Sequence, residues 1–224
     1  MGQRHQIYVA LPAAGSGYGS NRSERVIGIH HQWLYGHTAV HMAKRFLTFV
    51  DRARETDGRW HPIVSGFQSP MNILRAIYSS DPDIGYYHDV HDLEGELGDP
   101  RLGDNNDGIT VFDLRALPEK RGPISYCFVS FGHKGLPELV PISARSYCRA
   151  YYPAEVPETR VRGRIAPTLD GRPNVAETRV RAFEKLKVPL MTPRALHELW
   201  PDTFPVVARD LRPRLVLPEL GDHE

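Results

Sequence analysis

Histidine is the residue type that stands out in this sequence, which has eleven histidines among 224 residues. Six of them gather in two short windows: His30, His31, His37 and His41 in the first, and His88 and His91 in the second. An imidazole can bind a metal ion, transfer a proton or donate a hydrogen bond to an anion. Each window is therefore a candidate site, although no complete catalytic signature in the sequence names a reaction.

The second window lies in a strongly acidic segment. Residues 81–107 contain nine acidic residues against the single Arg101, a local charge of about minus eight in a chain of net charge +1. Like charges at this density repel one another unless a cation or a basic partner compensates them. We therefore predict a divalent metal site for Zn²⁺, Mn²⁺ or Mg²⁺, with ligands among His88, His91, Asp89, Asp92, Asp104 and Asp107. A surface loop of Asx turns is the alternative interpretation.

The first window surrounds the start of the clearest amphipathic helix in the sequence, at residues 37–54. His37 and His41 are four residues apart, a spacing that lets two imidazoles share a metal ion. Lys44 and Arg45 follow on the same face, and their positive charges disfavour a dication there. The same donors suit a phosphate or a carboxylate. A solvated helix face is the third interpretation.

The residues just before this helix extend the candidate site. A strand that runs into a helix N-terminus brings backbone N–H groups together, which favours an anion. Neighbouring residues of a strand point to opposite sides, so at most one of His30 and His31 faces such a pocket. We predict an anion or substrate site formed by Arg4, His30, His31, Trp33, His37, His41, Lys44 and Arg45.

A basic segment at residues 142–187 reverses the charge balance. It has ten basic residues against five acidic ones, with Tyr147, Tyr151 and Tyr152 interleaved. Proteins that bind single-stranded nucleic acid combine aromatic stacking and phosphate contacts in this way. We predict a nucleic-acid or partner-binding surface at Arg160, Arg162 and Arg164. Pairing with the acidic segment, within the molecule or across a dimer, explains the composition equally well.

The elements that position these residues follow from hydrophobic periodicity. Alternation predicts an antiparallel hairpin of strands at 5–11 and 25–31, and apolar runs predict strands at 109–114 and 124–131. Besides 37–54, capping residues and helical periodicity predict helices at 69–78, 142–152, 175–187 and 193–200. Strands followed by helices are typical of an α+β fold. We expect an antiparallel sheet of at least four strands packed with helices, and a helical C-terminal part.

The length of the chain favours one domain, or one domain with an appendage. We expect an α+β core domain at residues 1–152, followed at 153–224 by a proline- and arginine-rich linker and a helical extension packed on the core. Only Cys127 and Cys148 are present, without paired spacing, so we expect buried, reduced thiols. No signal segment or apolar membrane span is visible, which predicts a cytoplasmic protein that does not contact a membrane.

Three stretches carry a resemblance to known proteins: residues 1–8 (Met-Gly-Gln-Arg-His-Gln-Ile-Tyr), 29–36 and 104–111. They resemble phage and prophage proteins that open with Met-Gly-x-Arg-His, over roughly the first two thirds of the chain. This implies no particular activity, but it implies a phage-encoded protein in the cytoplasm of the host cell. The start also resembles the N-terminal-nucleophile fold of class II glutamine amidotransferases. Those enzymes need cysteine where this chain has Gly2, so the likeness implies the fold without the chemistry.

Two functional hypotheses follow. The first is a metal-dependent hydrolase of a nucleotide or another phosphorylated substrate, because a bound metal ion supplies the activated water that the side chains do not offer. The second is a non-catalytic phage accessory module that binds a host protein, a nucleotide or a nucleic acid. Convergence of the two histidine windows in space favours the first hypothesis, and wide separation favours the second.

Overall fold

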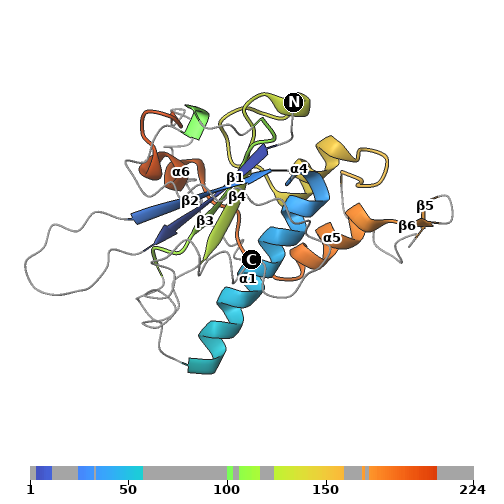
Figure 1. Ribbon diagram of the computed structural model, residues 1–224, viewed down its shortest axis with the longest axis horizontal. Coiled ribbons are helices and arrows are strands. Elements are labelled where there is room, and N and C mark those ends of the chain that lie inside the picture. Colours follow the sequence, from blue (N-terminus) through green and yellow to red (C-terminus); the bar gives the residue numbers. More distant parts are fainter. Residues whose placement is uncertain are drawn as a thin grey trace, which may run out of the picture.

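The computed structural model describes residues 4–11, 25–32, 34–57, 100–102, 106–116, 124–158, 168–169 and 172–205. The strands are β1 (Arg4–Leu11), β2 (Arg25–Gln32), β3 (Ile109–Asp113), β4 (Ser125–Val129), β5 (Thr168–Leu169) and β6 (Arg172–Pro173). The helices are α1 (Gly36–Asp57), α4 (Ala144–Tyr151), α5 (Val175–Glu184) and α6 (Pro193–Leu199), with short 3-10 helices η1 (Pro100–Leu102) and η2 (His133–Gly135). Together they form the predicted α+β fold, in which helices pack against a four-stranded sheet (Figure 1).

The strand order of the sheet is β2-β1-β3-β4. The outer pairs, β1 with β2 and β3 with β4, are antiparallel. The central pair is parallel, with Gln6 opposite Ile109 and Ala10 opposite Asp113. The sheet is therefore mostly antiparallel but mixed. A parallel pair needs a long connection that returns the chain to the same end of the sheet, and here β2 and α1 lie within that connection.

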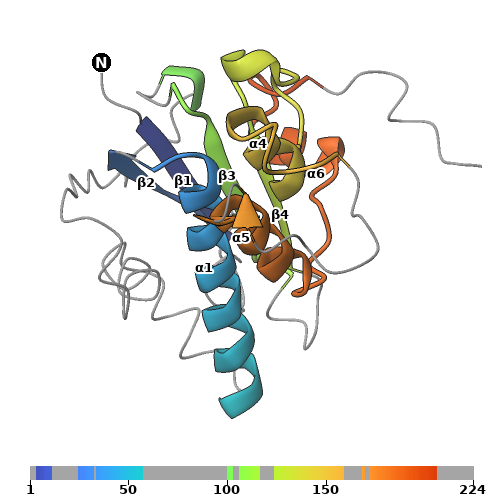
Figure 2. The same ribbon diagram turned by 90° about the vertical axis from the view of Figure 1, so that its right-hand side faces the viewer.

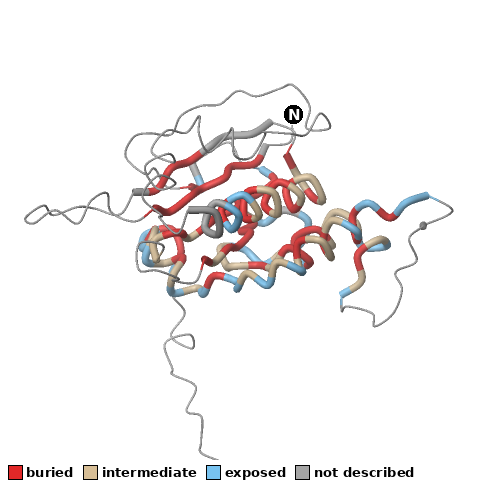
Figure 3. Tube along the Cα trace, turned by 90° about the horizontal axis from the view of Figure 1, so that it is seen from below, coloured by how far each residue is buried: buried red, intermediate tan, exposed pale blue. Residues whose placement is uncertain are grey.

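The described helices agree with the periodicity of the sequence. α1 buries its predicted apolar arc apart from Phe49, which is exposed. The helices α4, α5 and α6 begin after Ser143, Asn174 and Thr192, whose side chains each accept a hydrogen bond from a backbone N–H three residues later. Buried and more exposed positions consequently recur along each helix with the helical period (Figure 3).

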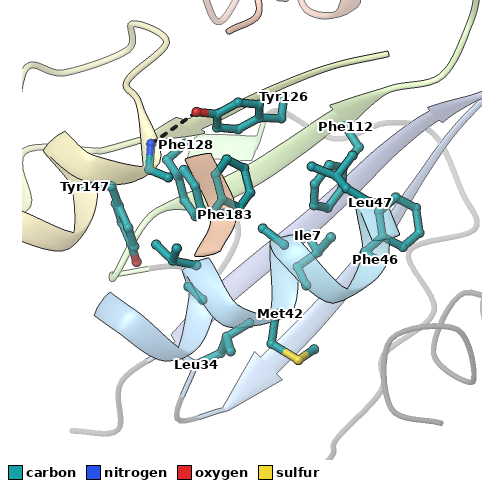
Figure 4. Close-up of a cluster of buried hydrophobic side chains, with 14 of the residues drawn as sticks. Ile7, Leu34, Met42, Phe46, Leu47, Phe112, Tyr126, Phe128, Tyr147 and Phe183 are labelled. Carbon is teal, nitrogen blue, oxygen red and sulfur yellow. Dashed lines mark hydrogen bonds between the residues drawn. The ribbon is translucent and has the colours of Figure 1, made fainter. Parts of the chain in front are cut away.

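Apolar side chains form a core on each face of the sheet. On one face, α1, α4 and α5 pack against alternate residues of β1, including Ile7 and Val9 (Figure 4). On the other face, α6 and the residues after it pack against β1 through Tyr8. Its ring makes an edge-to-face contact with Trp200, with the ring centroids 5.1 Å apart. The helices α1 and α6 accordingly lie on opposite sides of the sheet (Figure 2).

The alternation in β1 predicts one buried face and one exposed face, and this prediction is wrong. Gln6, Tyr8 and Ala10, expected to face solvent, are 3, 4 and 0 % exposed. The reason is that β1 is a central strand and α6 covers its second face. The polar atoms there satisfy each other, because the Tyr8 hydroxyl donates to Gln6 Oε1 at 2.8 Å.

An ion cluster joins α4 to α5. The buried Arg145 donates to both carboxylate oxygens of Glu177 and to both of Glu184. Arg181 donates to Glu177 as well, at 2.6 Å. Two arginines therefore share the buried Glu177, and the mutual bonds offset the desolvation that isolated charges would suffer.

Within the described parts of the chain, no helix combines the length and the apolar character that a membrane crossing requires. Both cysteines are free and buried, as predicted. Burial raises the pKa of Cys148 to about 12, so this thiol stays protonated at neutral pH.

Gly108 tests how closely the chain approaches β4 as it enters β3. Its φ is +91°, and a Cβ at this position would lie 2.4 Å from the carbonyl oxygen of Val129. Gly108→Ala adds backbone strain of about 1–3 kcal/mol, together with a collision that β4 can relieve only by moving. We expect the free energy of unfolding, measured by urea denaturation, to fall by roughly 3 kcal/mol or more.

Gly135→Ala is the matched control. Its φ is +67°, but no atom lies within 4 Å of the position that a Cβ would take. This substitution carries the conformational strain alone and should cost about 1–2 kcal/mol. Equal losses in the two variants would contradict the close approach of Gly108 to β4.

Candidate functional site

The start of β1, the end of β2, the start of β3 and the end of β4 lie side by side, and we name this place the polar end of the sheet. The strand register brings three pairs together here: His5 with His31, Gln6 with His30, and Gln6 with Ile109. Asp107, the last residue of the acidic segment, comes just before β3. The backbone thus brings part of the first histidine window and the end of the acidic segment to one place.

The backbone carbonyl of Asp107 is the centre of a buried hydrogen-bond network. The Tyr147 hydroxyl donates to it at 2.9 Å, and the Tyr151 hydroxyl and His5 Nδ1 lie at 3.4 and 3.3 Å. Tyr151 also packs closely on Gly36, where a Cβ would lie 3.2 Å from the tyrosine side chain. The network therefore ties β1, β3, α4 and the first residue of α1 together at one point.

His5 is 0 % exposed, and its partners determine which nitrogen carries the proton. A carbonyl oxygen only accepts, so Nδ1, which faces Asp107, is the donor. In the neutral ring Nε2 then accepts from the Thr110 hydroxyl at 2.7 Å. Nucleophilic enzymes use a similar pairing of hydroxyl and imidazole, but Thr110 is 1 % exposed and is sealed from any substrate. The pair fixes the start of β1 onto β3.

The side chain of Asp107 is the acidic group of the polar end. The residue is buried, and its Oδ1 accepts from the Tyr151 hydroxyl at 2.8 Å. Burial, and then the neighbouring Tyr147, raise the pKa of Tyr151 well above its ordinary value, and burial does the same for Tyr147. Both tyrosines therefore remain hydrogen-bond donors at neutral pH. The exposed Lys134 adds a cation, with Nζ 5.5 Å from the centroid of the Tyr151 ring.

His37 lies in the first turn of α1 between Arg179 of α5 and Tyr152. Its Nδ1 lies 2.7 Å from a guanidinium nitrogen of Arg179. A guanidinium only donates, so Nδ1 accepts and Nε2 carries the proton. The ring stacks on Tyr152 with centroids 5.0 Å apart. Burial, and then the charges of Arg179 and His41, lower the pKa of His37 to about 4. His37 is therefore neutral at pH 7.

The contact with Arg179 bears on the two chemical interpretations of His37 and His41. It occupies the Nδ1 lone pair of His37 and brings a cation to the start of the helix that also carries the partly exposed His41, Lys44 and Arg45. This arrangement disfavours a dication further and suits an anion. Across the described residues, moreover, no group of three or more histidine, cysteine, aspartate and glutamate side chains is placed to hold a metal ion.

Several predicted residues lie outside the described ones. They are Trp33, the metal-ligand candidates His88, Asp89, His91, Asp92 and Asp104, and the arginines Arg160, Arg162 and Arg164. The predicted helix at 69–78 and most of the acidic segment also lie outside them. For Arg4, His30 and His31 the structure gives the strand register.

The basic segment is compensated in part by its own acids. Arg145 and Arg181 pair with Glu177. Arg149 lies 3.6 Å from Glu158. Tyr147 is completely buried and cannot stack on a base, whereas Tyr151 and Tyr152 are partly exposed. Arg145, Arg149 and Arg181 thus find acidic partners inside this segment, without the acidic segment.

Sequence reasoning missed His5, Thr110, Tyr151 and Arg179. A histidine inside an alternating apolar strand is the one signal for His5, because such a residue needs buried partners. Tyr147 and Tyr151 are four apart, a spacing that puts them on one helix face. Nothing local distinguishes Arg179 from the other arginines of its segment.

A pocket of about 200 Å³ lies away from the polar end, where β4 begins. Its lining is formed by Leu47, Asp51, Ile124, Leu186, Lys187, Val188 and Pro189. None of the predicted site residues contributes to it. We therefore do not place the candidate site in this pocket.

Comparison of the chain with protein-family models, with curated proteins and with solved structures returns no match. Function is therefore inferred from the geometry of the polar end.

His37 predicts a pH dependence of stability. Its pKa is lowered from 6.5 to about 4 by folding. Between these values the unfolded chain binds a proton at this residue that the folded chain does not bind. The contribution of His37 to the free energy of unfolding should therefore be complete above pH 6.5 and should be lost as the pH falls toward 4.

Two measurements check this expectation. In urea denaturation, His37→Gln should show a weaker loss of stability over the same pH window, because glutamine does not titrate. In an NMR titration of the folded wild type, the His37 imidazole should have its midpoint near pH 4. A midpoint near 6.5 would mean that His37 is solvated and does not contact Arg179.

Proposed function

We propose that the chain hydrolyses a nucleotide or another small phosphorylated molecule at the polar end of the sheet, with a divalent metal ion. The observation that supports this most is that the end of the acidic segment and part of the first histidine window lie at the same end of the sheet. Asp107, the last residue of the acidic segment, lies just before β3. β1 pairs with β3 on one side and, on the other, with β2, which contains His30 and His31.

Metal-dependent hydrolysis of a phosphate ester needs one set of groups that bind the metal ion and another set that bind the phosphate. The polar end offers both. Asp107 provides a carboxylate, held by Tyr151. Lys134 and Arg179 provide positive charge beside the rings of Tyr151 and the His37–Tyr152 stack.

A divalent ion held by the acidic segment would lower the pKa of a bound water and so supply the nucleophile. Among the described residues Asp107 is the candidate ligand. Metal-binding carboxylates are usually hydrogen-bonded to a neighbour that orients them, and the Tyr151 hydroxyl does this for Asp107. In our proposal His88, Asp89, His91, Asp92 and Asp104 complete the ligand set. The Tyr151 hydroxyl orients the carboxylate, and the buried Tyr147 holds the backbone of Asp107.

The test is Asp107→Asn in protein purified without a histidine tag. Asparagine keeps the size of the side chain and an oxygen that can accept from Tyr151, but it loses the charge. We expect metal content and metal-dependent phosphate release from a nucleotide panel to fall at least about tenfold. The melting temperature without metal should change little, because the hydrogen bond is retained.

Asp113→Asn is the matched control, because Asp113 lies at the opposite end of β3 and pairs with Arg115. It should keep full metal binding and activity. The proposal fails if the wild type binds less than about 0.1 equivalent of metal and shows no thermal shift with Mn²⁺ or Zn²⁺. It also fails if the two variants lose activity equally.

One observation favours a non-catalytic module instead: the imidazole–hydroxyl pair of His5 and Thr110 is sealed from solvent. In that case the candidate binding residues are Arg160, Arg162 and Arg164, and the partner is a nucleic acid or an acidic host protein. Reversing these three charges to glutamate should weaken binding to single-stranded DNA and flatten its salt dependence, because each phosphate contact releases counterions. Binding of equal strength at low and high salt would eliminate this alternative.

A further inference from the structure

Arg179 of α5 faces α1 and has no acidic partner among the described residues. It donates to Nδ1 of His37 at 2.7 Å, and it forms no ion pair with any described carboxylate. By contrast, Arg145 and Arg181 of the same region pair with Glu177. A guanidinium bonded to a neutral imidazole keeps its whole positive charge.

The surroundings hold this charge in a fixed position. The ring of His37 stacks on Tyr152. Tyr152 in turn packs so closely on the start of α1 that a Cβ at Gly36 would lie 2.6 Å from its ring. A guanidinium has five N–H groups, and the bond to His37 uses one of them. Among the described residues, no carboxylate accepts from the others.

The groups nearby are mainly donors. His37 carries its proton on Nε2, and His41 is close enough to influence His37 electrostatically. An acid, Glu155, is close as well. Burial raises the pKa of Tyr152 to about 12; the charge of Glu155 adds to this shift and the charge of Arg179 opposes it. Glu155 forms no ion pair with Arg179, so it weakens the positive potential without occupying the guanidinium.

We infer that Arg179, positioned by His37, binds the phosphate group of the substrate. This rests on the proposed function for the substrate class, and it assigns recognition to an arginine of α5 that lies outside the first histidine window. A planar guanidinium donates two parallel hydrogen bonds to phosphate oxygens, which a lysine cannot do. His37 has a positioning role: its Nδ1 accepts from the guanidinium, and its ring is held by the stack on Tyr152.

The experiment titrates inorganic phosphate into the full chain without metal and follows the imidazole resonances of His37 by NMR. Wild type should show a saturable shift with a Kd on the order of millimolar, and acetate should bind more weakly. Arg179→Gln should weaken phosphate binding at least about tenfold. Arg179→Lys should recover only part of it, because the charge returns without the fork.

Arg172→Gln is the matched control, since Arg172 is exposed on β6 and is remote in the fold from α1. It should bind phosphate as the wild type does, and thermal melting of all variants reports whether they fold. Unchanged phosphate affinity in both Arg179 variants, or a phosphate titration that leaves His37 unshifted, overturns the inference.

The same variants separate this inference from the hydrolase proposal. If phosphate binding depends on Arg179 but no nucleotide is hydrolysed with any metal, the site stands and the proposed reaction fails. If hydrolysis is found and Arg179→Gln leaves its KM unchanged, the reaction stands and the assignment of Arg179 fails.

Discussion

The parallel pairing of β1 with β3 is the constraint on which the rest of the structure depends. It brings the starts of both strands to one end of the sheet and so lets His5 contact Asp107, 102 residues later in the chain. Gly108 allows the chain to enter β3 in close contact with β4, which no residue with a Cβ permits. The carbonyl of Asp107 then accepts from α4, and α4 contacts the start of α1. One strand pairing thereby fixes four elements around one polar cluster.

Burying so many polar groups is costly unless each finds a partner. In this network the donors of His5, Tyr147 and Tyr151 converge on the backbone and side chain of Asp107. Groups satisfied in this way cannot rearrange independently, which makes the network a rigid support for side chains nearer the surface. His37 and Arg179 differ from it, because among the described residues the guanidinium bonds a neutral ring and no carboxylate. The rigid network supports the site, and this arginine without an ion pair is the feature that points to a ligand.

Much of the fold follows from local sequence, and much of the site does not. Helix periods, the cap at Thr192 and the strand runs are short-range signals, and the described elements agree with them. Alternation does not distinguish parallel from antiparallel neighbours, so the central β1–β3 pairing was not foreseen. It also cannot reveal that α6 covers the second face of β1. Asp107 and His37 were identified by residue type, but their partners Tyr151 and Arg179 come from helices far along the chain. Spacing carries no information about such contacts.

The most direct test of the proposed site is to locate, by NMR, where a paramagnetic metal ion binds to the folded chain. Mn²⁺ added below one equivalent, with a nucleotide, broadens NMR signals of nearby amides. We expect the amides of Gly36, Gly108 and Thr110 to lose intensity, while those of Leu11, Leu114 and Ser125, at the opposite end of the sheet, keep it. Broadening centred on the opposite end, or none that is specific, would contradict the assignment of function to the polar end.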